Sequence, residues 1–183
     1  AATHAHVGSD VTIGIHCHDD TGCAVANSMA AVRAGARHVQ GTLNGLGERT
    51  GNANLTSIIP NLELKQHYRC LPERRMERLT VVSHRIAETL NRAVDPQAPY
   101  VGSSAFAHKA GLHVSAIARA KDAYEHVSPE AVGNGTRFVV SEMAGKATIQ
   151  MKADDLGIDI DGPAVMQVID DLKRLEHEGY HFE

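Results

Sequence analysis

Apolar and polar side chains alternate along residues 11–18, which is the pattern of a β-strand with one buried face. The apolar face carries Val11, Ile13, Ile15 and Cys17. The opposite face carries Thr12, Gly14, His16 and His18. Because side chains two positions apart on a strand share a face, the imidazoles of His16 and His18 are predicted to project side by side.

The segments that follow alternate between a helical and a strand pattern. Apolar positions spaced by four and three predict a helix over residues 21–34, with Asp20 or Thr21 as its N-cap. These positions are Val25, Met29 and Val32. Residues 36–43 predict a second strand. A strand, a helix and a strand in this order indicate a parallel pair joined by a right-handed crossover.

A glycine-rich loop, residues 44–52, follows the second predicted strand. Glycines at the end of a parallel strand favour a close approach of the backbone to a ligand or metal, although a plain connecting loop is the simpler interpretation. The loop lacks the Gly-Lys-Ser/Thr ending of a nucleotide-binding P-loop. The next apolar segment contains Pro60, which predicts a short or kinked helix.

Longer helical patterns dominate the second half of the chain. A helix is predicted to open at Pro72 and to continue to Val94, as a packing or dimerisation helix. Its apolar stripe is Met76, Leu79, Val82, Ile86, Leu90 and Val94. The run Asp95–Pro99 predicts a rigid break, and residues 161–163 predict the start of a last helix. The core positions of that helix are Val165, Val168, Ile169, Leu172 and Leu175.

Composition narrows the class of protein. With 43% hydrophobic and 22% charged residues the chain can bury a core. A net charge of -4 argues against a nucleic-acid partner, which requires a basic face. No apolar run reaches the roughly 20 residues that span a bilayer, so no membrane partner is expected. Three cysteines without a disulfide-like pattern indicate a reducing, cytoplasmic compartment, and Cys17 is predicted to be a small core residue.

His16 and His18 lie where a parallel strand ends, which is where ligands collect in α/β folds. Two neighbouring imidazoles are typical ligands for zinc or manganese, whereas two hydrogen-bonded strand histidines are the alternative. Two β-α units cannot close an eight-stranded barrel, which needs about 250 residues. Together with the ends at Ala1 and Glu183, this suggests an internal fragment of a longer protein.

Three blocks of sequence resemble one family. The first block runs from His16 to Ser28 and is similar to that family's His-x-His-Asn-Asp-x-Gly-x-Ala-Val-Ala-Asn-Ser pattern. The second block runs from Gly41 to Asn52, and the third runs from Ala105 to His113. The chain resembles the acyl-CoA-condensing metalloenzymes, which include the 2-isopropylmalate, homocitrate and citramalate synthases and share a barrel with hydroxymethylglutaryl-CoA lyase.

Other segments resemble the citramalate synthase branch most, and they are residues 124–127, 141–146 and 175–183. The resemblance implies the C-terminal part of a TIM (α/β)8 barrel followed by a mainly helical subdomain, in a homodimer. It also implies condensation of acetyl-CoA with pyruvate to (R)-citramalate, a step toward isoleucine. The implied division is residues 1–70 for the last barrel units, 71–100 for a linker helix and 101–183 for the post-barrel subdomain.

The resemblance also implies roles for single residues. His16 and His18 would be metal ligands and Asn52 a neighbouring or direct ligand of a divalent ion such as Zn, Mn or Mg. His113 and Tyr124 would be catalytic. The family's remaining ligand, an Asp, and its catalytic Glu belong to strands that this chain does not contain.

The sequence departs from the family pattern at three places. Asp19 stands where Asn is usual and would add a carboxylate near the metal. Ser103 replaces a frequent Glu, and residues 135–137 hold fewer arginines than usual. These departures bear on metal preference and acyl-CoA contacts rather than on the class of reaction.

The chemistry is a Claisen-type condensation in which a metal stabilises the developing alkoxide and a base removes a proton from the thioester methyl. His113 is the candidate for this proton transfer or for activating the water that hydrolyses the thioester, and Tyr124 for donating a hydrogen bond. The alternatives are a 2-isopropylmalate or homocitrate synthase, a lyase of the same barrel family, and a non-catalytic metal-binding or dimerisation fragment. Residues 100–183 argue against the lyase, which lacks a long post-barrel region.

Overall fold

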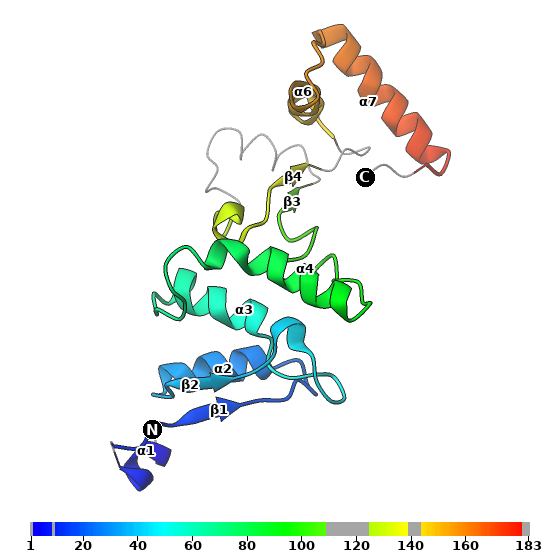
Figure 1. Ribbon diagram of the computed structural model, residues 1–183. Helices are drawn as coiled ribbons and strands as arrows, with labels where there is room; N and C mark the ends of the chain where they lie inside the picture. The colour runs from blue at the N-terminus through cyan, green and yellow to red at the C-terminus, as the bar shows by residue number, and fades with distance from the viewer. Residues whose placement is uncertain (1, 9, 109–124, 139–143, 181–183) are drawn as a thin grey trace. The chain divides into compact units, whose positions relative to one another are not determined.

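The protein is described by a computed structural model that covers residues 2–8, 10–108, 125–138 and 144–180 and contains both helices and strands (Figure 1). The chain divides into two compact units. The first unit is Ala1–Ala105 with Ala131–Gly133, and the second is Phe106–Glu130 with Asn134–Glu183.

The first unit contains a short parallel sheet. Helix α1 (Ala2–Val7) precedes strand β1 (Gly14–His16), which pairs with strand β2 (His38–Gln40) in parallel. Helix α2 (Ala24–Arg33) connects the two strands. This confirms the predicted strand, helix and parallel strand, although all three elements are shorter than the sequence suggested.

Helix α2 ends at Arg33, and Gly35 turns the chain after it. Gly35 adopts a φ of 113°, and its N–H donates to the carbonyl of Val32. The N–H of Ala36 donates to Ala31 at 2.9 Å. Only glycine enters this backbone region without strain, so the turn returns the chain directly into β2.

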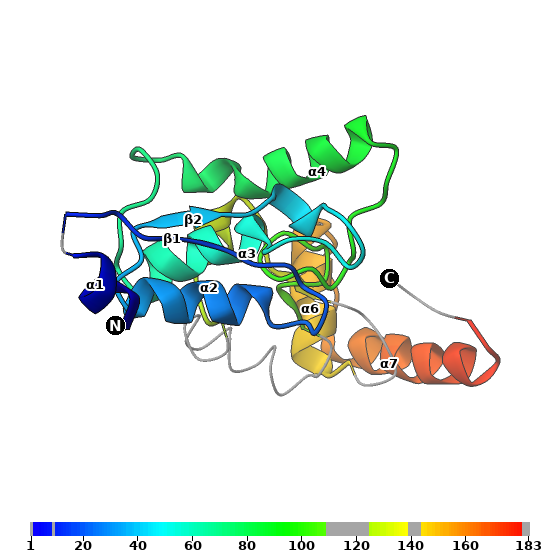
Figure 2. The same ribbon diagram turned by 90° about the horizontal axis from the view of Figure 1, so that it is seen from below.

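The core of the first unit lies on the face of β1 and β2 that the alternation predicts to be apolar. Helices α2 and α3 lie side by side against the strands on this face (Figure 2). The buried residues of this cluster are Ala24, Met29, Val32, Ala53, Ile58 and Leu62. Cys17 and Val39 pack against them, and Cys17 is a free thiol, which confirms the interpretation of Cys17 as a small core residue. Val11 is 48% exposed and is not part of this core.

Helix α3 (Leu55–Pro60) begins at Asn54, whose side chain accepts the N–H of Thr56. At Pro60 the helix widens into the π-helical segment η2 (Asn61–Lys65). Proline cannot donate a backbone hydrogen bond, so the local change in helix type at Pro60 follows from its chemistry. The predicted short or kinked helix is confirmed.

The single helix predicted from Pro72 to Val94 is wrong. Arg74 has a φ of 58°, so no helix can pass through it. The 3-10 turn η3 (Met76–Arg78) then leads into helix α4 (Leu79–Thr89), which ends before Asn91 at a φ of 50°. The side of α4 that is most buried carries Leu79, Ser83 and Ala87. The apolar stripe predicted from spacing runs beside this face, and Leu90 remains 49% exposed.

The break at residues 95–99 is a compact loop of the first unit. The N–H of Ala98 donates to Asp95, and the N–H of Gly102 donates to Ala98. A Cβ on Gly102 would lie 2.3 Å from the carbonyl oxygen of Pro96, so the loop closes too tightly for a side chain there.

The second unit combines two very short strands with a pair of helices. Strand β3 (Ala107–His108) pairs in parallel with β4 (Arg137–Phe138), and the 3-10 turn η5 spans Pro129–Val132. Helix α6 (Lys146–Asp155) packs against helix α7 (Gly162–His177). The shared core is Ala144, Ile149, Val165 and Ile169. The last helix begins where the sequence predicts, with the Asp161 carboxylate accepting the N–H of Ala164 at 2.8 Å.

Helix α6 was not predicted, because its apolar positions do not form a clear stripe. The pattern of residues 114–120 also predicts a helix, and these residues lie outside the described part of the chain. Within the parts of the chain that the structure describes, no helix combines the length and the apolar character needed to cross a bilayer.

Candidate metal centre

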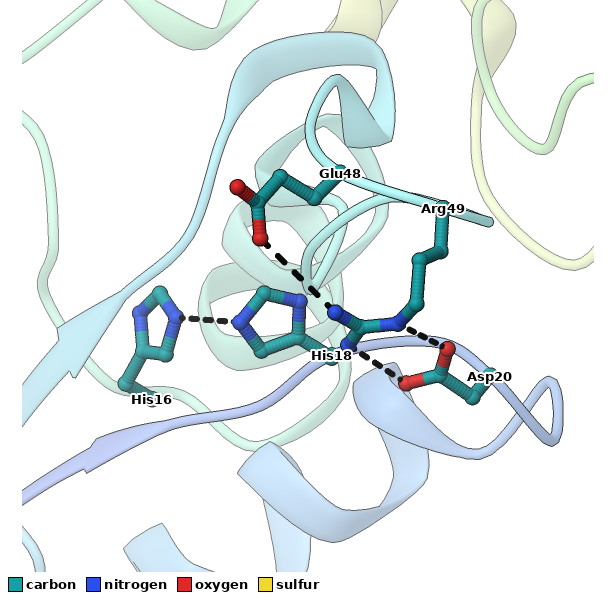
Figure 3. A network of polar contacts seen from close by, with 5 residues as sticks. All are labelled: His16, His18, Asp20, Glu48 and Arg49. Atoms are coloured by element: carbon teal, nitrogen blue, oxygen red, sulfur yellow. Dashed lines mark hydrogen bonds and ion pairs between the residues drawn. The ribbon is translucent and has the colours of Figure 1, made fainter.

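The imidazoles of His16 and His18 face each other at the end of β1. Their Nε2 atoms are 3.3 Å apart, and the ring planes meet at 72° (Figure 3). Both side chains lie on the exposed face of the strand, opposite Cys17. The two rings therefore share one side of the strand, as the alternation predicts, and their Nε2 atoms lie within hydrogen-bonding distance of each other.

The separation of the two nitrogens suits chelation. Two imidazole nitrogens at about 2.0–2.1 Å from one tetrahedral zinc ion lie about 3.3–3.4 Å apart. In octahedral coordination with slightly longer bonds, two adjacent ligand nitrogens lie about 3.1 Å apart. The observed 3.3 Å falls within this span, so the pair could hold one ion without a change of backbone.

The glycine-rich loop carries Asn52 to the same place. His18 and Asn52 form an antiparallel bridge, and the N–H of Ala53 donates to the carbonyl of Cys17 at 2.9 Å. A third backbone bond joins the N–H of Asp19 to the carbonyl of Gly51 at 2.9 Å. The end of β1 and the end of the loop are thus held together by their backbones.

The side-chain oxygen of Asn52 fits a cation ligand. Asn52 Oδ1 is buried and has no hydrogen-bond donor among the described residues. A buried carbonyl oxygen without a donor is costly, and a bound cation satisfies it. Imidazole nitrogens suit zinc, and carbonyl oxygens suit manganese and magnesium. The residues present therefore fit a divalent ion.

Two glycines allow the loop to close on Asn52. Gly51 has a φ of 106°, and a Cβ there would lie 1.9 Å from the carbonyl oxygen of Gly45. A Cβ on Gly47 would lie 2.8 Å from the Asn52 side chain. These glycines allow the loop to pack on its own backbone and on Asn52, and the predicted close approach to a ligand or metal stays a prediction.

The carboxylate of Asp19 is engaged by the helix that follows it. Its Oδ1 accepts the N–H of Ala24, the first residue of α2, at 2.8 Å. A carboxylate at this position also interacts favourably with the positive end of the helix. The predicted cap at Asp20 or Thr21 is wrong, because α2 begins three residues later and Asp19 reaches its first N–H.

Asp20 instead pairs with Arg49. Arg49 Nε donates to Asp20 Oδ1 at 2.6 Å and Arg49 NH2 to Asp20 Oδ2 at 2.9 Å (Figure 3). Glu48 lies further from the guanidinium, at 3.7 Å. The hydrogen bonds from Arg49 hold the pKa of Asp20 below its usual value, and the charge of His18 adds to this effect. The pair raises the pKa of Arg49.

Sequence reasoning missed this ion pair. Asp20 and Arg49 belong to the two blocks that carry the candidate ligands, but their pairing spans 29 positions. No periodicity links residues so far apart, and only the folded loops bring them together.

The predicted catalytic residues His113 and Tyr124 lie outside the described residues. In the described parts of the chain, no third His, Cys, Asp or Glu side chain joins His16 and His18 in a cluster that could hold a metal. Among the described residues the candidate site is therefore the pair of imidazoles, with Asn52 held beside His18 by backbone pairing.

Comparison with known families identifies the family to which the chain belongs. Residues 1–90 match the family described as HMGL-like, and residues 100–180 match the family described as homocitrate synthase post-HMGL domain-like. The chain belongs to the HMGL-like family, in the group whose members carry the post-HMGL domain. The HMGL-like domain is a TIM-barrel family, in keeping with the parallel β-α-β unit of residues 14–40.

The chain is similar to several (R)-citramalate synthases. It is 50% identical over 176 residues to the (R)-citramalate synthase of Aquifex aeolicus, covering 95% of this chain and 33% of the relative. It is 54% identical over 173 residues to that of Streptomyces coelicolor, covering 93% and 32%. A probable 2-isopropylmalate synthase of Methanopyrus kandleri is 38% identical, covering 93% and 34%. The chain spans about a third of the length of these curated relatives.

Proposed function

We propose that this chain supplies one side of the metal centre of a synthase that condenses acetyl-CoA with pyruvate to (R)-citramalate. The observation that carries the proposal is the separation of 3.3 Å between His16 Nε2 and His18 Nε2, with Asn52, whose buried Oδ1 has no donor among the described residues, bridged to His18 through the backbone. The similarity to (R)-citramalate synthases supports the choice of reaction.

Three side chains would hold the ion in this proposal, and they are His16, His18 and Asn52. A divalent ion bound there would act as a Lewis acid toward the keto oxygen of a 2-oxo acid. The protein's own contribution is to fix the donors. Backbone bonds on both sides of His18 and Asn52 hold the two segments together before any ligand binds, so little backbone order has to be acquired on binding.

The proton transfers are assigned to residues 113 and 124. His113 would remove a proton from the thioester methyl or activate water for thioester hydrolysis, and Tyr124 would donate a hydrogen bond. Both assignments rest on the resemblance of the block that ends at His113 and of the segment that begins at Tyr124.

The remaining proposals concern the whole protein. We place residues 1–70 in the last units of a TIM (α/β)8 barrel, 71–100 in a linker and 101–183 in a mainly helical post-barrel subdomain. The synthase would act as a homodimer in the cytoplasm, in isoleucine biosynthesis. Its metal would be zinc, manganese or magnesium.

The experiment that tests the proposal measures thiol release from acetyl-CoA by a full-length synthase carrying this chain. Pyruvate, 2-oxoisovalerate and 2-oxoglutarate are supplied in turn, with metal added and removed by a chelator. We expect pyruvate to give a kcat/KM at least about tenfold above the other two acids, because even one or two methylenes change binding by about 10–200-fold.

Other outcomes identify the alternatives. A preference for 2-oxoisovalerate would indicate a 2-isopropylmalate synthase, and a preference for 2-oxoglutarate a homocitrate synthase. A folded, metal-loaded protein that releases no thiol with any acid would indicate a non-catalytic metal-binding or dimerisation role.

A further inference from the structure

The two loops that carry the candidate ligands are joined by one side-chain pair. Asp20 lies two positions after His18, and Arg49 lies three positions before Asn52. The Arg49–Asp20 pair crosses between these loops with two hydrogen bonds, of 2.6 and 2.9 Å (Figure 3). It is therefore placed to control how far the Asn52 loop stands from the histidines.

The pair has the geometry of a fixed clamp. A planar guanidinium that meets both oxygens of one carboxylate fixes orientation as well as distance, which a single hydrogen bond does not. Arg49 also has a φ of 57°, a backbone region that residues other than glycine rarely adopt. This left-handed conformation turns the chain between Glu48 and Gly51. The turn is closed by a hydrogen bond of 2.9 Å from the Gly51 N–H to the Glu48 carbonyl.

The exposure of the pair argues against a role in overall stability. The side chains of Arg49 and Asp20 are 55% and 47% exposed. Exposed ion pairs contribute little to folding because water and salt screen them. Removing the clamp should therefore leave the fold intact and act on the local position of the loop.

The same contacts exclude a competing role for Arg49 as an anion-binding residue. Its Nε and NH2 both donate to Asp20, and NH1 lies 3.7 Å from Glu48. A guanidinium already neutralised by two carboxylates is a poor receptor for a phosphate or a substrate carboxylate. The geometry favours a positioning role.

We infer that Asp20 and Arg49 are positioning residues that hold Asn52 Oδ1 within reach of an ion bound by His16 and His18. This inference rests on the proposed metal site. It predicts that the clamp sets the affinity for the metal, while the three ligands themselves stay unchanged. Residues that orient metal ligands typically change metal affinity by about 10–100-fold when they are removed.

The experiment compares Asp20→Asn and Arg49→Lys with the parent in a full-length synthase. Asp20→Asn removes the charge, and Arg49→Lys keeps the charge but loses the two-pronged geometry. Glu48→Gln is the matched control, because it removes one carboxylate from the same loop without breaking the clamp. The readouts are the dissociation constant for Zn²⁺ and Mn²⁺ by chelator competition, the visible absorption of the Co²⁺-loaded protein, and the thermal midpoint without metal.

We expect both clamp variants to bind metal about tenfold more weakly and to change the Co²⁺ spectrum, with little change in the thermal midpoint. The double variant should be no weaker than the single ones, because both changes remove the same contact. Glu48→Gln should bind within about twofold of the parent.

Three results would overturn the inference. They are parental metal affinity in both clamp variants, an equal loss in Glu48→Gln, and losses that add in the double variant. His16→Ala separates this from failure of the proposed site. If His16→Ala keeps full metal affinity, the site itself is misplaced; if His16→Ala loses metal while the clamp variants do not, only the clamp is rejected.

Discussion

In the first unit, side-chain contacts join residues that are far apart in sequence, whereas along helices α6 and α7 of the second unit they join residues three or four positions apart. The Asp20–Arg49 pair spans 29 positions in the first unit. Asn44 and Ser83 exchange two hydrogen bonds across 39 positions, through Ser83 Oγ at 2.6 Å and Asn44 Nδ2 at 2.9 Å.

Along α6 and α7 the side-chain contacts join residues three or four positions apart. Gln150 donates to Asp154, and Arg174 contacts both Asp171 and Glu178. Such pairs follow from helical periodicity, since residues three and four apart are neighbours on a helix. The apolar stripe of α7 packs on α6 for the same reason.

The difference separates loops that bring distant residues together from a helix pair whose side-chain contacts follow its own periodicity. The loops that carry the candidate site also contain strained backbone. Asn44 and Arg49 adopt φ values of 61° and 57°, on either side of glycines at positive φ. Strained residues persist where the surrounding contacts over-determine them, and they are common near functional sites.

The largest expected effect comes from His16→Ala. In a full-length synthase this change should weaken metal binding by more than about a hundredfold, because a direct ligand contributes more than the residues that orient it. Turnover should fall with the metal. The fold should survive because the His16 side chain lies on the exposed face of β1.

The matched control is His38→Ala. His38 is an exposed histidine on the neighbouring strand β2, and it has no part in the candidate site. Metal titration and far-UV circular dichroism of both variants check the prediction. Equal metal affinity in the parent and in His16→Ala would contradict the ligand assignment.

The next effect tests the strained loop. Gly51→Ala should destabilise the first unit by about 3 kcal/mol and weaken metal binding, because the added Cβ meets the Gly45 carbonyl in a conformation that only glycine adopts easily. Gly22→Ala is the control, since Gly22 has a φ of 70° but no atom within 4 Å of a Cβ. It should cost about 1 kcal/mol from backbone strain alone.

Urea unfolding of the two glycine variants gives the comparison. Similar losses of unfolding free energy in both variants would show that the close approach of Gly51 to Gly45 is unimportant. A larger loss in Gly51→Ala would sharpen the contrast between the site loops and the helical pair.

A smaller effect is expected at the start of α7. Asp161→Ala removes the carboxylate that accepts the Ala164 N–H and should destabilise the second unit by about 1 kcal/mol. Asp159→Ala is the control, because Asp159 is exposed and precedes the cap. Thermal unfolding measures the loss. Because the cap acts only on its own helix, metal affinity should stay at the parental value. A changed metal affinity in Asp161→Ala would contradict the assignment of metal binding to the first unit alone.

The smallest effect concerns Cys70. Burial, with a further contribution from the charge of Glu63, raises the pKa of the Cys70 thiol. Glu63→Gln should lower that pKa and speed alkylation of Cys70 by iodoacetamide a few-fold near pH 8, because only the thiolate reacts. The difference should vanish at a pH above both values.

Mass spectrometry can follow the alkylation of each cysteine separately. Cys23 provides the internal control, because it forms its hydrogen bond with the carbonyl of Thr21 and not with Glu63. An unchanged Cys70 rate at every pH would show that the carboxylate does not influence the thiol.

Elements governed by local pattern could be predicted from the sequence. The alternation over residues 11–18 placed His16 and His18 on one face, and the order of patterns predicted a parallel pair of strands. Asp161 marked the beginning of the last helix. Each of these depends on neighbours within one or two turns or on strand alternation, which the sequence displays directly.

Elements decided by distant contacts could not be predicted. The long helix expected from Pro72 is interrupted by the left-handed backbone of Arg74, and spacing of apolar residues does not report backbone conformation. The N-cap position of helix α2 is Cys23 rather than Asp20 or Thr21; Asp19 accepts the first N–H of the helix, and Asp20 pairs with Arg49 from another loop. The roles predicted for His113 and Tyr124 stay predictions.

The sequence alone determined which donor types stand near one another along the chain, because imidazoles two residues apart on a strand must share a side. Only the tertiary structure decided that the backbone of Asn52 pairs with that of His18, and that Asp20 and Arg49 join the two loops. The physical reason is that periodicity acts over a few residues, whereas the closing of one loop on another depends on backbone hydrogen bonds and glycine conformations that form only when the chain has folded.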